Sequence, residues 1–436
     1  MKHKNNLSRI KDRFFILWQY KFFRCAVLIH LAYFVISLVL VLTILRGQND
    51  FLIYYTAGGV FYNNPNNLYV QDQYIWDYRY LPLSATFFIP FYLLGFDLGF
   101  ILFHTLNLIL NLMICKLLYK IIILVRGQDH EKDDRRIILY MSVYLVAAPQ
   151  MFNYILGQIN LYITFFMLVA LYIFLMHETL KWQFIGSMIL GVSIILKPTA
   201  LLLIPFLLVF NYDVIQKKLD FDLMKSFARI AGVLFPISLN IIIFILYPKL
   251  WDGFIETNFT GGNPLTLNFS FSITKIVLNF CYMYNVPFNQ MYVFLIIFGI
   301  LGFLGYTFYL FGKYHKRDAI IYGFTFGLVI TLLVYFDSWD HHLLNLIPLL
   351  MIIIFNLPRH SELSDKYFKK GFFFFSFFDL AFMGLWFITI IFWFPYNFAS
   401  TIFLILVFYG LSKHSLSAGD NSNINNFNKG ARDDGF

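Results

Sequence analysis

The sequence predicts an all-α polytopic membrane protein with about twelve transmembrane helices. Hydrophobic residues make up 59% of the 436 residues, whereas charged residues make up only 13%, about half the share in an ordinary soluble chain. The mean hydropathy is +0.68. Apolar stretches recur along the whole chain, and about twelve spans of ~20 residues would account for most of this apolar content. The composition excludes a soluble fold, because so few charges could not cover its surface.

The predicted spans follow the apolar stretches in order. The first, 22–45, follows a basic N-terminal segment, 1–21, and is too long for the core of a cleaved signal. The other spans are predicted at 99–122, 137–156, 160–177, 183–197, 198–212, 228–247, 290–312, 319–336, 342–357, 371–393 and 397–411. The polar, Asn-rich tail 412–436 is predicted to be disordered.

Two segments leave alternatives open. Segment 81–96 is apolar but short and contains Pro82 and Pro90, so it either spans the membrane or lies at the interface or re-enters. Residues 183–212 form either two short helices that meet at Lys197-Pro198 or one long helix kinked at Pro198.

The distribution of basic residues predicts the orientation. With 81–96 at the interface, 28 of the 33 Lys and Arg residues fall on one side of the membrane. Cytoplasmic loops carry the excess of Lys and Arg, so we expect both termini inside and the long stretches 46–98 and 248–289 outside. The net charge of +9 therefore reports orientation rather than nucleic-acid binding. The three scattered cysteines indicate neither a metal site nor a disulfide framework.

Six sequence-distant segments bring polar side chains to the predicted outer face. The candidate site residues are Asp50, Tyr54, Tyr55, Arg79, Tyr80, Gln158, Asn160, Lys197, Asn268, Trp339, Asp340, His341 and His342. A carboxylate beside cations suits chemistry on a lipid-linked phosphate. The carboxylate can accept a proton from an acceptor hydroxyl, and the cations can stabilise the charge that develops on a leaving phosphate.

Several of these polar residues also have a structural explanation. Lys197 indicates a functional site because a charge within an apolar run is costly, although its side chain could reach outward to the interface. The aromatic residues suit sugar stacking or an interfacial belt. His104, Asn107 and Asn111 lie on one stripe of the second span and predict helix–helix contacts. Asp379, in the eleventh span, has no partner that the sequence identifies.

Five short motifs follow one another in the chain. They are Asp50 to Tyr55 with Tyr78-x-Tyr80-x-Pro82-Leu83, Gly157-Gln158-x-Asn160, Leu196-Lys197-Pro198, Asn268-x-Ser270, and Ser338-Trp339-Asp340-His341-His342. In this order, over about residues 45–350, they resemble glycosyltransferase family 87. This family comprises polyprenyl-phosphate-mannose-dependent mannosyltransferases of the GT-C superfamily.

The resemblance implies a GT-C fold. It places a conserved module of about seven spans at 22–247, with interface helices in a catalytic outer loop, 46–98. A second outer loop, 248–289, and a variable set of C-terminal spans, 290–411, would follow. It further implies transfer of a sugar, mannose by default, from a polyprenyl-phosphate donor to a hydroxyl of a glycan or glycolipid, with inversion. The active site would face the extracytoplasmic side of the cell membrane.

The resemblance also implies roles for individual residues. Asp50 would be the general base, and Lys197 would hold the donor phosphate with help from Arg79, His341 and His342. The remaining candidates would bind substrate. No metal or other cofactor is expected, because the first outer loop lacks the paired carboxylates that would hold a hard cation. A transporter or lipid-linked-sugar flippase is the alternative, but no internal repeat is visible and transporters place their site near the midplane.

Overall fold

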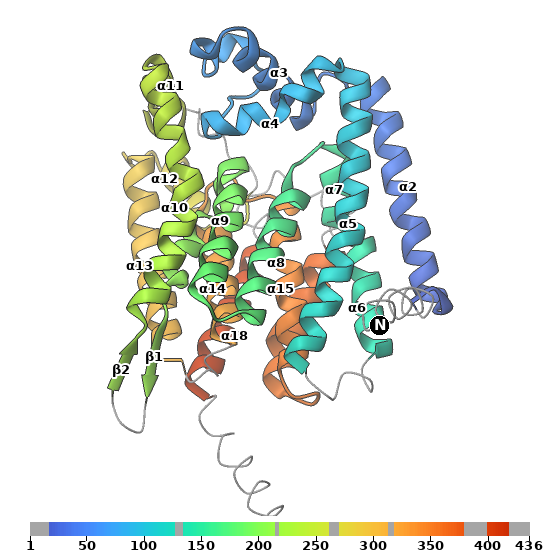
Figure 1. The fold of residues 1–436 in the computed structure, drawn as a ribbon, viewed down its shortest axis with the longest axis vertical. Helices are drawn as coiled ribbons and strands as arrows, with labels where there is room; N and C mark the ends of the chain where they lie inside the picture. The colour runs from blue at the N-terminus through green and yellow to red at the C-terminus, as the bar shows by residue number, and fades with distance from the viewer. Residues whose placement is uncertain are drawn as a thin grey trace, which may run out of the picture.

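The computed structural model describes residues 17–126, 134–213, 218–260, 270–312, 318–378 and 399–417. These residues form a helical bundle with two further helices lying across one end (Figure 1). The all-α prediction is therefore confirmed, apart from one small sheet. That sheet pairs strand β1 (Phe210–Asp213) antiparallel with strand β2 (Lys218–Phe221) at the other end of the bundle.

Five helices among the described residues are long and apolar enough to cross a membrane. They are α2 (Lys21–Thr43), α5 (Phe96–Arg126), the broken helix α6 (Asp134–Val146) with α7 (Ala148–Ile155), α10 (Leu223–Leu246) and α13 (Gln290–Leu310). Shorter apolar helices run beside them: α8 (Asn160–Met176), α9 (Leu180–Leu196), α14 (Ala319–Val334), α15 (Leu343–Asn356) and α18 (Ala399–Ser417). The number of twelve spans stays a prediction.

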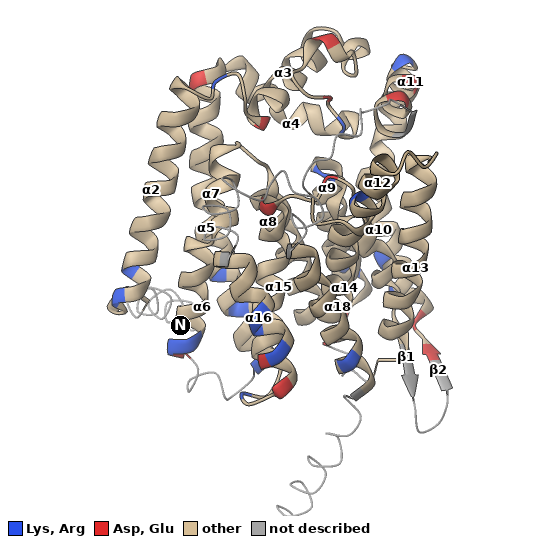
Figure 2. Ribbon diagram, turned by 180° about the vertical axis from the view of Figure 1, so that it is seen from behind, with Lys and Arg blue, Asp and Glu red and all other residues tan. Residues whose placement is uncertain are grey.

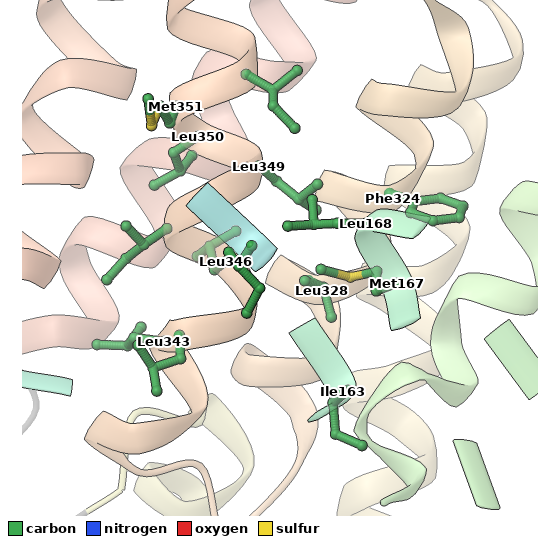
Figure 3. Packing of buried hydrophobic residues seen from close by; sticks show 14 of the residues in the cluster. Ile163, Met167, Leu168, Phe324, Leu328, Leu343, Leu346, Leu349, Leu350 and Met351 are labelled. Carbon is green, nitrogen blue, oxygen red and sulfur yellow. The ribbon is translucent and has the colours of Figure 1, made fainter. Parts of the chain in front are cut away.

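The centre of the bundle is apolar on every side. All residues of α14 from Ile320 to Val334 are buried, as expected for a helix that is hydrophobic all round. Figure 3 shows leucines of α15 packed beside Ile163 and Met167 of α8 and Leu328 of α14. This packed centre provides a rigid support for the loops at the helix ends.

Segment 81–96 forms a short helix at the end of the bundle. Helix α4 (Pro82–Leu93) has twelve residues and is about 18 Å long, too short for a hydrocarbon core of ~30 Å. It packs against α3 (Asp50–Asn63) across the end of the bundle (Figure 1). Gly58 permits this close packing, because a Cβ there would lie 2.7 Å from the backbone carbon of Phe88.

The predicted span 198–212 is wrong in its helix type and length. Helix α9 ends at Leu196, and Lys197 has extended dihedrals, φ −156° and ψ 124°. A ten-residue 3₁₀ helix, η4 (Pro198–Leu207), then leads into β1. The physical reason is Pro198, which pushes the preceding residue out of the helical region. Of the two alternatives, two short helices that meet at Lys197-Pro198 are therefore confirmed, although the second is a 3₁₀ helix, and one long kinked helix is wrong.

The C-terminal predictions are only partly covered by the structure. Helix α18 continues to Ser417, so the first residues of the tail 412–436, predicted to be disordered, are helical; the tail beyond them lies outside the described residues. The predicted span 371–393 is described only to residue 378, and Asp379 lies outside the described residues.

His104 and Asn111 of the polar stripe on the second span make helix–helix contacts, as predicted, whereas neither polar side-chain atom of buried Asn107 has a hydrogen-bond partner among the described residues. His104 Nε2 lies 2.7 Å from the carbonyl oxygen of Tyr154 on α7. Asn111 exchanges two 3.0 Å hydrogen bonds with the Gln150 amide, and its Nδ2 also lies 3.2 Å from His30 Nε2 on α2. Such buried polar contacts tie helices together within a membrane.

We predict that the two ends of the bundle lie on opposite sides of the membrane. Figure 2 shows Lys and Arg gathered at the end that holds α6 and α16 (Lys370–Phe373), opposite α3 and α4. In a variant without the three native cysteines, His130→Cys should resist an impermeant thiol reagent added outside intact cells. Asp72→Cys, in the predicted outer loop, should be labelled. Labelling at 130 and protection at 72 would reverse the orientation.

Candidate active site

The first element of the site is the N-terminus of α3, which carries Asp50. The Asn49 side chain caps this helix by accepting a 2.9 Å hydrogen bond from the Leu52 amide. The Asp50 amide donates a 2.8 Å hydrogen bond to the carbonyl oxygen of Leu156. A carboxylate in the first turn is favoured by the helix dipole. Asp50 is thereby fixed against the turn between α7 and α8.

The second element is that turn, which presents Gln158. Gly157 adopts φ +65°, and a Cβ there would lie 2.7 Å from Phe51 Cβ on α3. Glycine is favoured here for two reasons: it adopts a positive φ without strain, and it has no Cβ to clash with Phe51. The turn therefore approaches α3 closely enough for Gln158 to meet Asp50.

Gln158 links the carboxylate to the cation of the site. Its Nε2 donates a hydrogen bond to Asp50 Oδ2. Its Oε1 accepts hydrogen bonds from Lys197 Nζ at 3.0 Å and from Tyr54 OH at 3.3 Å. Because the ammonium requires the amide oxygen, the amide nitrogen must face the carboxylate, so this network fixes the orientation of the amide.

Lys197 is 5% exposed and has amide oxygens as its hydrogen-bond acceptors. Besides Gln158, its Nζ donates to Asn160 Oδ1 at 3.2 Å. The break between α9 and η4 places this cation at the helix end. Ser84 Oγ of α4 donates a 3.3 Å hydrogen bond to the carbonyl oxygen of Leu196, the last residue of α9. Since these acceptors are neutral and Asp50 is reached only through the Gln158 amide, the ammonium makes no direct ion pair among the described residues and can attract an anion.

Asp50, at the start of α3, is only partly exposed. This burial raises the pKa of Asp50 above its usual value, while the Lys197 charge and the Gln158 hydrogen bond act in the opposite direction. A raised pKa brings the group closer to the range in which it can both accept and release a proton near neutral pH.

Two buried histidines lie within electrostatic reach of Lys197. His341 and His342 belong to the 3₁₀ turn η6 (Asp340–His342), and their ring centroids are 4.3 Å apart. The Trp339 amide donates a 3.0 Å hydrogen bond to His342 Nδ1. When neutral, this ring must therefore carry its proton on Nε2. That buried nitrogen has no hydrogen-bond partner in the part of the chain that the structure describes.

The remaining predicted residues divide into those near this cluster and those apart from it. Tyr80 joins the cluster, since its hydroxyl lies 3.1 Å from that of Tyr54. Arg79 instead forms a 2.8 Å ion pair with Asp337. Tyr55 faces away and packs against the rings of Tyr92 and Phe96.

The fourth and fifth motifs meet, as their shared placement on the outer face predicts. Asn268 lies outside the described residues, but Ser270 Oγ accepts a 3.3 Å hydrogen bond from the Ser338 amide. The Phe271 amide donates to the Ser338 carbonyl oxygen at 3.0 Å. Asp340 is buried beside the two histidines, and Trp339 is partly exposed.

Two supporting residues are missing from the sequence-based list. Asn240 Oδ1 of α10 accepts a 2.9 Å hydrogen bond from the Leu83 amide and so anchors the start of α4. Asn153 Oδ1 accepts a 3.4 Å hydrogen bond from Asn160. A lone amide within an apolar span is the signal that could have identified them. Within the described ranges, no group of three or more His, Cys, Asp or Glu side chains is arranged to hold a metal.

A helical bundle with membrane-length helices and a carboxylate–amide–ammonium cluster at a helix end fits the class of membrane glycosyltransferases. The family model of glycosyltransferase family 87 matches residues 78–335, and the chain belongs to this family. The matched range includes Gln158 and Lys197, whereas Asp50, His341 and His342 lie outside it. No match is found among curated proteins.

We predict that Gln158 controls both the position and the pKa of Asp50. Gln158→Ala removes a hydrogen bond to a charged group, worth ~1.5–3 kcal/mol, and should lower the rate of sugar transfer roughly 10-fold or more. Gln158→Glu places a second carboxyl group beside Asp50 and should shift the pH–rate profile to higher pH, because like charges raise the pKa of a carboxyl. Gln48→Glu, exposed on the same side, is the matched control. If Gln158→Glu and Gln48→Glu gave the same pH–rate profile, the claim that Gln158 sets the pKa of Asp50 would be contradicted.

Proposed function

We propose that the protein transfers a sugar, mannose by default, from a polyprenyl-phosphate donor to a hydroxyl of a glycan or glycolipid. The transfer takes place at the outer face of the cell membrane and inverts the anomeric carbon. The observation that carries this proposal is the Gln158 bridge between the Asp50 carboxylate and the Lys197 ammonium. Membership of a glycosyltransferase family favours this activity over transport.

Asp50 is the general base in this mechanism. Its carboxylate takes the proton of the acceptor hydroxyl while the hydroxyl oxygen bonds to the anomeric carbon. The bond from that carbon to the phosphate oxygen breaks, and the phosphate leaves with the electron pair. For a direct displacement, the acceptor hydroxyl near Asp50 and the phosphate near Lys197 must lie on opposite sides of the anomeric carbon. A single displacement in this arrangement inverts the configuration.

Lys197 holds the donor phosphate and stabilises the charge that it gains on leaving. The lipid phosphate in turn offsets the cost of the buried ammonium. His342 supports this role, because its Nε2, which has no hydrogen-bond partner among the described residues, can donate to a phosphate oxygen in the same region. His341 lies beside it. Arg79 helps only after leaving Asp337, with which it is paired.

The remaining predicted side chains surround the sugar. Tyr54, Tyr80 and Asn160 supply hydroxyls and an amide next to the bridge, and Trp339, Asp340 and Asn268 complete the substrate site. The identity of the sugar is tested by incubating the purified protein with a panel of polyprenyl-phosphate sugars and a membrane lipid extract. The product identifies the donor and acceptor together.

The first prediction of this mechanism concerns Asp50. Asp50→Asn keeps the shape but cannot accept a proton, so turnover should fall roughly 10²–10⁴-fold while donor binding is retained. In the wild type, transfer should be lost as the pH falls through the pKa of Asp50, because only the deprotonated form is a base. Since that pKa is raised, the loss should begin at a higher pH than for an exposed aspartate. An Asp50→Asn enzyme of near-normal rate would assign the base elsewhere, with Asp340 next in line.

The second prediction concerns Lys197. Lys197→Met restores an uninterrupted apolar helix end and should weaken donor binding and lower kcat/KM roughly 10–100-fold, as expected for a lost charge-assisted contact. It should also move the pH–rate profile to higher pH, because the Lys197 charge lowers the pKa of Asp50. Lys197→Arg should recover part of the activity, since its charge is placed differently. A Met variant that binds and transfers like the wild type would show that Lys197 has no role in the site.

A further inference from the structure

The outer loop contains a pocket on the face of α3 opposite Asp50. It is a shallow pocket of about 310 Å³ that opens to the surface, since Asn63, Asn64 and Gln73 in its lining are exposed. The walls come from α3, from the short turns η1 (Pro65–Asn67) and η2 (Gln71–Gln73), and from the end of α4. None of the residues that line this pocket has a role in the mechanism proposed above.

One wall of the pocket is a fixed aromatic corner. Tyr55 and Tyr92 lie with ring centroids 5.3 Å apart and planes inclined by 53°. Gly59 lets the Tyr92 ring lie on α3, because a Cβ there would be 2.3 Å from Tyr92 Cε2. Asn63 Nδ2 donates to Tyr92 OH at 3.2 Å and to the Gly59 carbonyl oxygen at 2.9 Å. The ring is therefore held in place before any ligand binds.

The other wall consists of neutral amides. Asn64, Asn67 and Gln73 line the pocket, and their side chains make no hydrogen bond to another described residue. No charged residue is part of the lining. Amides offer donors and acceptors together, which matches the hydroxyls of a sugar, and tyrosine rings pack on its apolar face. A phosphate or a uronate would instead call for Arg or Lys.

The position of the pocket shows which part of a glycan it could hold. Tyr55, Gly59 and Asn63 follow one another at four-residue spacing on one face of α3, whereas Asp50 and Tyr54 face Gln158 on the opposite side. Gly59 is nine residues from Asp50, about 14 Å along the helix axis. A sugar in this pocket cannot be the one that reacts at Asp50.

We propose that this pocket is a second sugar site, which binds a neutral sugar residue of the acceptor glycan several residues away from the reacting end. The proposal rests on the transferase function proposed above. It makes long neutral acceptors better substrates than short ones, through KM rather than kcat, because the distant contact is present equally in the ground state and the transition state.

Binding is tested first, without catalysis. The full-length protein carrying Asp50→Asn, purified in detergent, is titrated with mannobiose and mannohexaose by ligand-detected NMR. The hexaose should bind more tightly than the biose, and the double variant Asn67→Ala/Gln73→Ala should weaken hexaose binding roughly 5-fold or more through two lost hydrogen bonds. Asn66→Ala, exposed next to the pocket but outside its lining, is the matched control. Unchanged hexaose binding in the double variant would overturn the proposal.

Transfer is then measured with alkyl mannobiose and alkyl mannohexaose as acceptors. The double variant should raise the KM of the hexaose and leave its kcat, and both constants for the biose, unchanged. An equal rise in KM for both acceptors would place these residues at the reacting sugar and contradict the proposal. If hexaose binding depends on Asn67 and Gln73 but no transfer occurs with any polyprenyl-phosphate sugar, the sugar site stands and the proposed transferase function fails.

Discussion

The cost of burying the Lys197 ammonium constrains the architecture around it. A charge that is 5% exposed near the end of an apolar helix requires oxygen partners at short range. The oxygens come from Gln158 and Asn160, at the turn between α7 and α8. Three further features accompany this arrangement: α9 stops at Leu196, the turn comes close to α3, and α3 begins at this level. Each is visible as a local feature of the chain.

These local features depend on residues with special backbone properties. Pro198 ends α9 and leaves Lys197 extended, so that its side chain leaves the helix towards Gln158 rather than towards lipid. Gly157 allows the turn its positive φ and its contact with Phe51. Gly58 lets α3 and α4 pack closely on each other, and Pro82 begins α4. The buried helices α14 and α15 then hold the two histidines at the same level.

The sequence predicted the elements that depend on local chemistry, and it failed where the answer depends on packing. Hydropathy located the long helices, and the rule that an intramembrane charge is costly singled out Lys197, which lies in the hydrogen-bonded cluster with Gln158 and Asn160. The ordered motifs identified the family. The sequence could not establish which face of α3 meets Gln158, because the rotation of a short helix is set by what it packs on. It therefore predicts that Tyr55 binds substrate, although this residue lies on the other face. Nor could the sequence pair Arg79 with Asp337, 258 residues later.

Gln158 connects the Asp50 carboxylate to the Lys197 ammonium through an amide and not through a direct ion pair. If Asp50 and Lys197 were in contact, each would neutralise the other: the carboxylate would be a weaker base, and the ammonium would not attract a phosphate. A neutral Gln158 satisfies one hydrogen-bonding position on each group and keeps both charges available. The amide also excludes the reverse arrangement, since its nitrogen cannot accept from the ammonium. The site thus holds two opposite charges at a fixed separation. In the proposed transfer, the acceptor hydroxyl binds at the carboxylate and the donor phosphate binds at the ammonium.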